Sequence, residues 1–224
     1  MLTQVLTFIG LIHAGACGTE GITLVTYVDT ATWEWGPSVV CLGYFDGVHI
    51  GHQALIRLTE TLAQEISIVS CVHSYDVPPI SLLKPDIPCQ VLTSFQEKCD
   101  LLQRYGAGIV AISHFNDRLQ HMPGERFFRE VLMERMQAKH LVVGFDHRFG
   151  FRGDTDVTRL QQLCDQHGLG LSVVPAVRTT GGQTVSSSSI RAALREGNYA
   201  LAQEMLGRPL TDSQLSCGCR QQLS

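Results

Sequence analysis

The chain has 224 residues, a hydrophobic content of 44% and a formal net charge of −4 with its nine histidines neutral. This length suits one domain of ordinary size, and the apolar fraction is that of a globular core, which excludes a largely disordered chain. No basic face is evident, and the longest apolar runs are far shorter than a membrane span. We therefore expect neither nucleic acid nor a membrane as a partner.

Residues 1–22 form an apolar stretch without a Lys or Arg ahead of it. A secretion signal requires such a charge, so we interpret 1–22 as an N-terminal extension outside the folded domain. Eight cysteines are spread along the chain without a Cys-x-x-Cys pair. Cys41 and Cys71 lie in apolar runs and are expected to be buried. Cys217 and Cys219 could supply half of a redox or metal site, but no second pair completes it, so we expect ordinary cysteines there. Reduced thiols fit a cytoplasmic location.

From residue 39 onward, strand patterns alternate with helical patterns, after a short strand-like run at 22–28. Strands are expected at 39–43, 66–75, 108–113, 139–144 and 171–177. Helices are expected at 50–64, 94–105, after Pro123, at 156–167, at 190–196 and up to Leu206, with a loop at 82–88. This alternation predicts an α/β fold with a doubly wound, five-stranded parallel sheet, which binds ligands outside the carboxyl ends of its strands.

The first candidate site is the stretch 39–56, where an apolar strand runs into a Gly- and Asp-rich turn and then a helix start. Such a turn holds phosphate, because the N–H groups of a first helical turn have no intrahelical partner. His49 and His52 are three residues apart and share one side of the helix, with Gly51 between them. Two imidazoles there can donate hydrogen bonds to phosphate oxygens. The alternative is a capping histidine and a packed one in an ordinary helix.

The second candidate site is the serine run 186–189, which is followed by Ile190 and Arg191. Serine hydroxyls at a helix start cap the helix and can also bind phosphate. Arg191 brings a fork of donors suited to phosphate oxygens. The alternative is a flexible serine linker with a surface arginine.

The third candidate site is the loop 144–150, which reads GFDHRFG. Two glycines bracket alternating aromatic and charged residues. The phenylalanines can wall a planar ring, and Asp146 can accept a hydrogen bond from a base or a ribose. The alternative is a surface loop anchored by two aromatic residues.

Taken together, the motifs resemble the FMN adenylyltransferase module of the prokaryotic bifunctional riboflavin kinase/FAD synthetases, in the nucleotidylyltransferase superfamily. Residues 42–53 read LGYFDGVHIGHQ and resemble the family's IGNFDGVHxGHQ. Residues 143–150 resemble its VGx[DN]FRFG, 185–191 its ISSTxIR, and 206–209 its closing LGRP. The resemblance spans about 22–209.

The resemblance implies a Rossmann-like nucleotidylyltransferase fold. It implies that the FMN phosphate attacks the α-phosphate of ATP directly, so that pyrophosphate leaves and FAD forms, with Mg²⁺ entering on ATP and no metal-binding residue assigned. The implied catalytic residues are His49, His52 and Arg191. The implied ATP-binding residues are Gly43, Phe45, Asp46, Gly47, His49, Gly51, His52, Ser187, Ser188 and Arg191. The residues implied to contact the flavin or nucleotide are Asp146, Arg148 and Phe149.

The chain departs from the family pattern at several positions near the implied site. Tyr44 stands where the family has Asn, and His147 where it has Phe. The family's Pro-His-Pro after the second strand reads Val-Pro-Pro at 77–79, without the histidine. These changes touch flavin or phosphate contacts more than the fold.

The adenylyltransferase domain is expected to span 23–209, with a short tail at 210–224. Because fifteen residues follow the closing motif, no riboflavin kinase activity is expected, and a separate kinase would supply FMN. Two alternatives remain: an adenylyltransferase for another phosphate acceptor, and a nucleotide- or flavin-binding protein of the same fold with lost or weak turnover. The Phe-Asp-Gly before His49 argues against the first alternative, and the presence of both histidines and Arg191 argues against the second.

Overall fold

The computed structural model describes residues 27–83, 90–212, 214 and 215. The expected N-terminal extension, Cys217 and Cys219 lie outside these residues. No helix within the described ranges has an apolar stretch long enough to cross a membrane.

Six strands form one sheet in the order β1-β4-β3-β2-β5-β8, and every neighbouring pair is parallel. They are β1 (Tyr27–Asp29), β2 (Ser38–Leu42), β3 (Val69–Tyr75), β4 (Ile109–Ser113), β5 (Ala138–Gly144) and β8 (Gly170–Val174). The parallel α/β sheet is confirmed, but the predicted number of five strands is wrong. The additional strand is β1, whose three residues pair with β4 at the edge of the sheet. It overlaps the strand-like run at 22–28, which is too short to decide its state from sequence.

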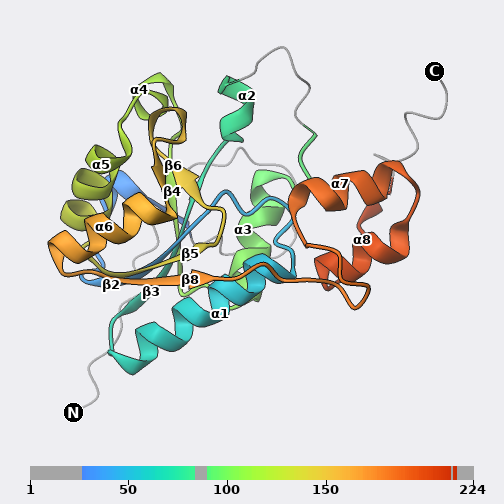
Figure 1. The fold of residues 1–224 in the computed structure, drawn as a ribbon, viewed down its shortest axis with the longest axis horizontal. Coiled ribbons are helices and arrows are strands. Elements are labelled where there is room, and N and C mark those ends of the chain that lie inside the picture. Colours follow the sequence, from blue (N-terminus) through green and yellow to red (C-terminus); the bar gives the residue numbers. More distant parts are fainter. Residues whose placement is uncertain (1–26, 84–89, 213, 216–224) are drawn as a thin grey trace, which may run out of the picture.

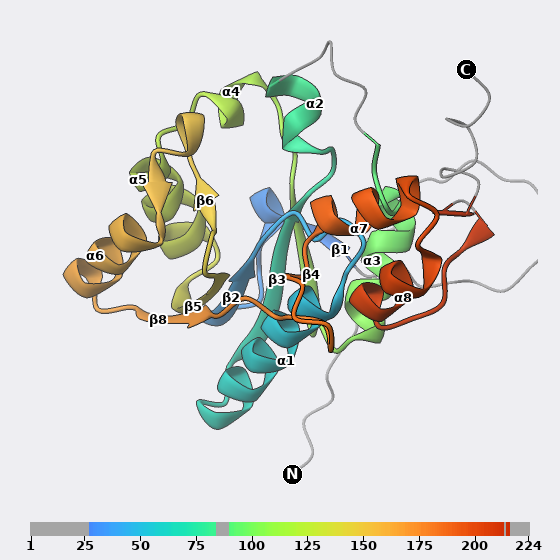
Figure 2. The ribbon, with the colours of Figure 1, turned by 45° about the vertical axis from the view of Figure 1, so that its right-hand side comes forward.

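Helices cover both faces of the sheet, as the doubly wound prediction requires (Figures 1 and 2). On one face lie α1 (Ile50–Glu65) and α3 (Phe95–Arg104). On the other lie α5 (Gly124–Phe127), its π-helical continuation η2 (Phe128–Arg135), and α6 (Val157–His167). Strand β2 supplies Val39 and Cys41 to the first face and Val40 and Leu42 to the second. Its continuous apolar run therefore reflects burial on both sides.

A smaller lobe beside the sheet is built from α7 (Ser187–Arg195) and α8 (Tyr199–Leu206) (Figure 2). Its own apolar core includes Ile190, Leu206 and, from the distant segment before α3, Leu92. Ser186 caps α7, and its hydroxyl and that of Ser189 form a reciprocal capping box. The serine run is thus a helix start rather than a flexible linker.

Short elements fill the connections: η1 (Thr30–Thr32), α2 (Pro79–Leu83), α4 (Asp117–Gln120), β6 (Arg148–Phe149), η3 (Phe151–Gly153) and β7 (Thr155–Asp156). Two of them correct the sequence analysis. Leu82 and Leu83, expected in a loop, end α2, and the rest of that expected loop lies outside the described residues. The loop that follows β5 contains a strand, because β6 pairs antiparallel with β7. Neither element is long enough to show a period in the sequence.

Candidate active site

The candidate site lies at the carboxyl ends of β2 and β5, where the winding of the sheet reverses. From β2 the chain winds to β3 and β4 on one side, and then returns to β5 and β8 on the other. A crevice forms where adjacent strands send their connections to opposite sides, and such crevices bind ligands in doubly wound folds. The turn after β2 and the loop after β5 both open onto this crevice.

His49 is the N-cap of α1, and its Nδ1 accepts a hydrogen bond from the backbone N–H of His52 at 3.3 Å. A neutral imidazole has one donor and one acceptor nitrogen, so this contact places the proton on Nε2. Burial lowers the pKa of His49 to about 4, and the positive charge of Arg208 acts in the same direction. His49 is therefore a neutral ring that presents a donor nitrogen.

His52 stacks on His49, with ring centroids 3.6 Å apart and planes inclined by 17°. Burial holds the pKa of His52 well below its usual range, and the nearby His49 and Lys98 act in the same direction. Its Nδ1 is buried without a hydrogen-bond partner. Such an atom carries a desolvation cost unless a ligand or a water molecule pairs with it. Phe45 and His52 also pack edge to face, with ring centroids 5.1 Å apart.

The turn between β2 and α1 is backbone-strained. Phe45 and Val48 have positive φ values of 61° and 41°, which residues other than glycine rarely adopt. Both are nearly inaccessible to solvent, so packing holds them in place. A Cβ at Gly51 would lie 3.2 Å from the ring of His49. The glycine within the first turn of the helix thus makes room for the capping imidazole.

Two cavities meet at this crevice. The first, of about 320 Å³, is lined by Phe45, His49, Gly51, His52, Asp146 and Ser187, among others. The second, of about 300 Å³, is lined by Tyr75, Phe115, Phe127, Phe149 and Arg152, among others. Both cavities share a wall made by Gly43, Tyr44, His147 and Arg148. We call them the histidine cavity and the aromatic cavity.

The structure therefore brings most, but not all, of the implied site residues together. Phe45, His49, Gly51, His52, Ser187 and Asp146 line the histidine cavity, Phe149 lines the aromatic cavity, and Gly43 and Arg148 line both. Asp46, Gly47, Ser188 and Arg191 do not line either. Ser187 also donates its hydroxyl to the backbone oxygen of Asp46 at 2.8 Å, which ties α7 to the turn after β2.

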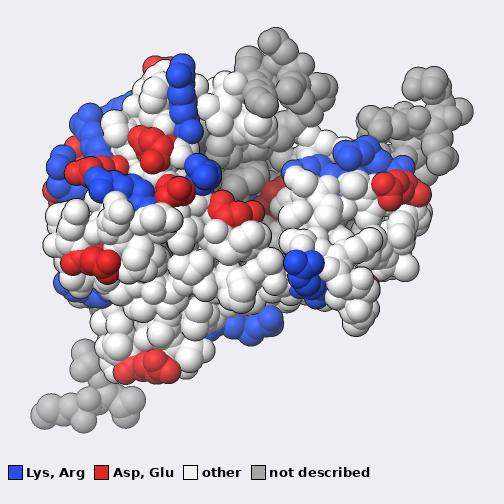
Figure 3. Space-filling model, in the orientation of Figure 1, with Lys and Arg blue, Asp and Glu red and all other residues white. Residues whose placement is uncertain are grey.

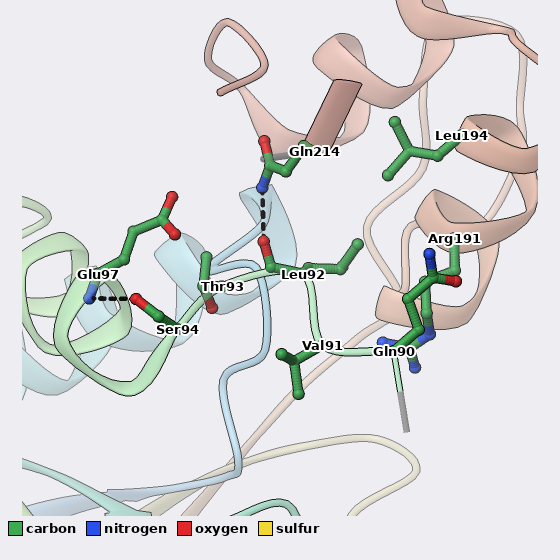
Figure 4. Close-up of a pocket in the computed structure, with 9 residues that line it drawn as sticks. All are labelled: Gln90, Val91, Leu92, Thr93, Ser94, Glu97, Arg191, Leu194 and Gln214. Carbon is green, nitrogen blue, oxygen red and sulfur yellow. Dashed lines mark hydrogen bonds between the residues drawn. The ribbon is translucent and has the colours of Figure 1, made fainter. Parts of the chain in front are cut away.

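Arg191 faces a third cavity, of about 290 Å³, together with Leu92, Leu194 and Gln214 (Figure 4). Its Nη1 donates to Oδ2 of Asp46 at 2.6 Å. Oδ1 of the same carboxylate accepts from the backbone N–H groups of Leu92 and Thr93. Burial raises the pKa of Asp46, while these N–H donors and Arg191 oppose that rise. Asp46 thus joins the turn after β2 to α7 and to the segment before α3.

Lys98 is a buried residue behind the shared wall that the sequence analysis missed. Its side chain is buried, and Nζ donates to the backbone oxygen of Tyr75 at 2.7 Å and to Oγ of Ser74 at 3.1 Å. Nζ also lies 4.0 Å from the ring centroid of Tyr44. A signal was present, because Lys98 occupies the apolar stripe that Phe95, Cys99 and Leu102 define at helical spacing.

Charge around the site is mixed. Figure 3 shows Lys and Arg interspersed with Asp and Glu over one face of the molecule, with wide uncharged areas between them. Within the described ranges, no group of three or more His, Cys, Asp and Glu side chains could hold a metal ion. Asp146 carries the carboxylate that lines the histidine cavity. A single carboxylate fits a magnesium ion that takes most of its ligands from phosphate oxygens and water.

These features define a class: a Rossmann-like α/β protein whose strand, turn and helix start at the switch point of the sheet form the floor of a cavity. The family model for FAD synthetase matches residues 31–189. The chain is 33% identical over 172 residues to a FAD synthetase of Listeria monocytogenes, covering 77% of this chain and 69% of that protein. The chain belongs to the FAD synthetase family.

Other relatives are longer than this chain. It is 30% identical to the bifunctional riboflavin kinase/FMN adenylyltransferases of Listeria monocytogenes and Escherichia coli. It spans 58% and 56% of their lengths, and the matches cover 82% and 78% of this chain. Among solved structures, a protein titled macrolide-efflux protein from Streptococcus pneumoniae superposes with a TM-score of 0.73 at 29% identity. That match covers 83% of this chain and 61% of the other.

Proposed function

We propose that this chain transfers the adenylyl group of ATP to the phosphate of FMN, producing FAD and pyrophosphate. The observation that carries the proposal is the pair of adjoining cavities with one shared wall. One is lined by imidazoles, glycine backbone and a serine hydroxyl, which suit phosphates. The other is lined by aromatic rings, which suit a planar flavin. Two substrates seated in these cavities would meet at Gly43, Tyr44, His147 and Arg148.

In this reaction an oxygen of the FMN phosphate forms a new bond to the α-phosphorus of ATP. The bond from that phosphorus to the bridging oxygen breaks, and pyrophosphate leaves with its electron pair. No covalent enzyme intermediate is required, so the protein acts by positioning and by stabilising charge. His49 presents its Nε2–H, because its Nδ1 accepts from the N–H of His52. The N-terminus of α1 adds the partial positive charge of a helix start. Because these donors are already in place, they cost little reorganisation in the transition state.

The aromatic cavity would hold the isoalloxazine ring. Tyr75 and Phe115 meet edge to face at 5.1 Å, and Phe127 lies 5.6 Å from Phe149. Such rings offer a large, rigid apolar surface to a planar ligand. Arg148 and Arg152 add positive charge beside them, which suits the FMN phosphate.

Magnesium, when bound with ATP, would supply charge neutralisation to the phosphates. Asp146, whose side chain lines the histidine cavity, would hold it. Ser187 would contact the phosphates from α7. Arg191 would join it only by exchanging Asp46 for a phosphate oxygen, since its Nη1 is engaged by that carboxylate.

We further propose that residues 23–209 form the catalytic domain and that the protein acts in the cytoplasm. Cys41, Cys71, Cys99 and Cys164 are free and buried, as in proteins of a reducing compartment. FMN is the phosphate ester of riboflavin, so a separate riboflavin kinase would supply the acceptor.

The test is to incubate the purified protein with FMN, ATP and Mg²⁺ and to separate the flavins by chromatography. We expect FAD and pyrophosphate to appear in equal amounts. Phosphopantetheine and nicotinamide mononucleotide serve as control acceptors that lack a flavin. Absence of FAD while ATP still binds, or a faster reaction with either control acceptor, would contradict the proposal.

A further inference from the structure

Lys98 is a buried cation with neutral partners. Its residue is 2% exposed, and its Nζ donates to a backbone oxygen and to a serine hydroxyl. Among the described residues, none of the carboxylates forms an ion pair with it. Removing an ammonium group from water costs several kcal/mol unless an opposite charge or strong hydrogen bonds compensate for it. A buried lysine without a paired carboxylate is therefore expected to serve a purpose besides stability.

The contacts of Lys98 lie just behind the place where the two cavities meet. Its Nζ faces the ring of Tyr44, which lines both cavities, at 4.0 Å. It also binds the backbone oxygen of Tyr75, which lines the aromatic cavity. Ser74 completes the group, because its hydroxyl accepts from Lys98 and donates to the backbone oxygen of Tyr44 at 3.0 Å. The ammonium thus links the end of β3 to the turn after β2, and the Tyr44 ring separates it from the junction of the two cavities.

The positive charge of Lys98 acts electrostatically on titratable groups near the cavities. It contributes to lowering the pKa of His52 in the histidine cavity and of His73 on β3. Burial lowers the pKa of Lys98 itself to about 8, although the negative charges of Asp46 and Asp76 oppose that shift. Both substrates of the proposed reaction carry phosphate groups. Phosphates brought to the shared wall would therefore supply the opposite charge that the free protein places only at a distance.

We propose that Lys98 is a positioning residue whose ammonium, held behind Tyr44, is balanced by the substrate phosphates at the junction of the two cavities. This inference rests on the proposed function, because that function is what brings two phosphorylated substrates to the junction. Lys98 acts through Tyr44 and through its field, and it does not touch the substrates. It therefore favours phosphorylated ligands over neutral ligands of the same shape.

The test compares FMN with riboflavin, which has the same ring but no phosphate, by titrating the quenching of flavin fluorescence. Lys98→Met and Lys98→Gln both remove the charge, and the glutamine keeps a hydrogen-bond donor. Lys98→Arg keeps the charge. Lys139→Met removes an exposed charge at the amino end of β5, away from the site, and is the matched control.

We expect the two neutral variants to weaken FMN binding about tenfold and riboflavin binding less than twofold. Lys98→Arg and Lys139→Met should keep the wild-type preference for FMN. If Lys98 only holds the fold together, the neutral variants will weaken both ligands equally. That result, or unchanged FMN binding, would overturn the inference.

A measurement on the wild type covers the case in which the neutral variants do not fold. Between pH 7 and 9 the groups facing Lys98 keep their charge: burial raises the pKa values of Tyr75 and Cys99, Arg191 pairs with the carboxylate of Asp46, and the pKa of Asp76 is lowered. The histidines His52 and His73 are neutral there. The preference for FMN should therefore fall across this range as Lys98 loses its proton, and a constant preference would contradict the inference.

The test of Lys98 and the test of the proposed function can fail independently of each other. FAD formation by the wild type tests the proposed function, and the preference for FMN over riboflavin tests Lys98. A protein that forms FAD but keeps its preference in Lys98→Gln retains the function and loses this inference. A protein that forms no FAD but loses its preference in Lys98→Gln does the reverse.

Discussion

Oδ2 of Asp46 and Nη1 of Arg191 lie 2.6 Å apart and join two segments that are 145 residues apart in the chain. The carboxylate side chain is 7% exposed and the arginine side chain 27%. Through this pair the turn that carries His49 is fixed to α7, which carries Ser187. The two motifs that the sequence assigns to phosphate are thus one mechanical unit.

The first prediction is that Asp46→Asn lowers the free energy of unfolding by about 1–3 kcal/mol, because it leaves Arg191 without its partner in a largely buried place. Arg191→Met should have a similar effect. The double variant should lose less free energy of unfolding than the two single variants lose in sum, because either single substitution already breaks the pair. Urea unfolding of the four proteins measures this coupling.

The control for this cycle is Glu125→Gln, which breaks the exposed pair with Arg159. Exposed pairs contribute little, so unfolding should scarcely change. Strict additivity of Asp46→Asn and Arg191→Met would show that the ion pair does not couple the two segments.

Much of the fold follows from local signals in the sequence. Ser94 and Asp156 cap α3 and α6 at the starts of the expected helices, and Gly168 ends α6 in the left-handed conformation. The strand, turn and helix around His49 also follow local rules, because hydrophobic period and capping act over a few residues. These signals suffice to place both histidines at the carboxyl edge of the sheet.

Other features depend on contacts between distant residues and leave no local signal. The pairing of Asp46 with Arg191 exists only once α7 packs beside the turn, so no local pattern in the sequence shows it. Strand β1 has three residues, and its state is decided by β4. Lys98 broke the apolar stripe of α3, but only the fold shows that its partners are Tyr44 and the end of β3.

The second prediction concerns pH and stability. Burial lowers the pKa of His49 and His147 to about 4 and that of His73 to about 3, against 6.5 in an unfolded chain. Between about pH 4 and 6.5 the unfolded chain therefore binds more protons than the folded protein. Stability contributed by these neutral histidines is full above pH 6.5 and is lost as the pH falls, by at most about 1.4 kcal/mol per pH unit for each histidine.

The measurement is the urea unfolding free energy at several values between pH 4 and 7.5. Asp46, whose pKa is raised, acts in the opposite direction at the acid end. In His147→Phe the unfolding free energy should change less steeply with pH, because the variant lacks one group that binds a proton only on unfolding. A slope that does not differ between wild type and His147→Phe would show that His147 is not buried as a neutral ring.

The third prediction is that Gly51→Ala lowers the rate of FAD formation without loss of stability. Alanine is favoured over glycine inside a helix by about 1 kcal/mol. Its Cβ would lie 3.2 Å from Cε1 and Nδ1 of His49, however, so the imidazole must shift away. Thermal unfolding should be unchanged or slightly raised, while kcat falls about tenfold or more. An unaltered kcat would mean that the exact placement of the His49 ring does not matter.

The fourth prediction separates binding from chemistry at His52. His52→Ala should reduce kcat by a factor of about 100 or more and change the dissociation constant of FMN less than threefold, because the ring lines the histidine cavity and not the aromatic one. The substitution also removes the stacking partner of His49. His52→Asn is the matched variant, since its amide can keep a donor near the position of Nδ1 and should restore part of the rate. FMN binding is followed by flavin fluorescence and turnover by chromatography. Equal losses in binding and rate would place His52 on the flavin side, and an unchanged rate would remove it from the phosphate site.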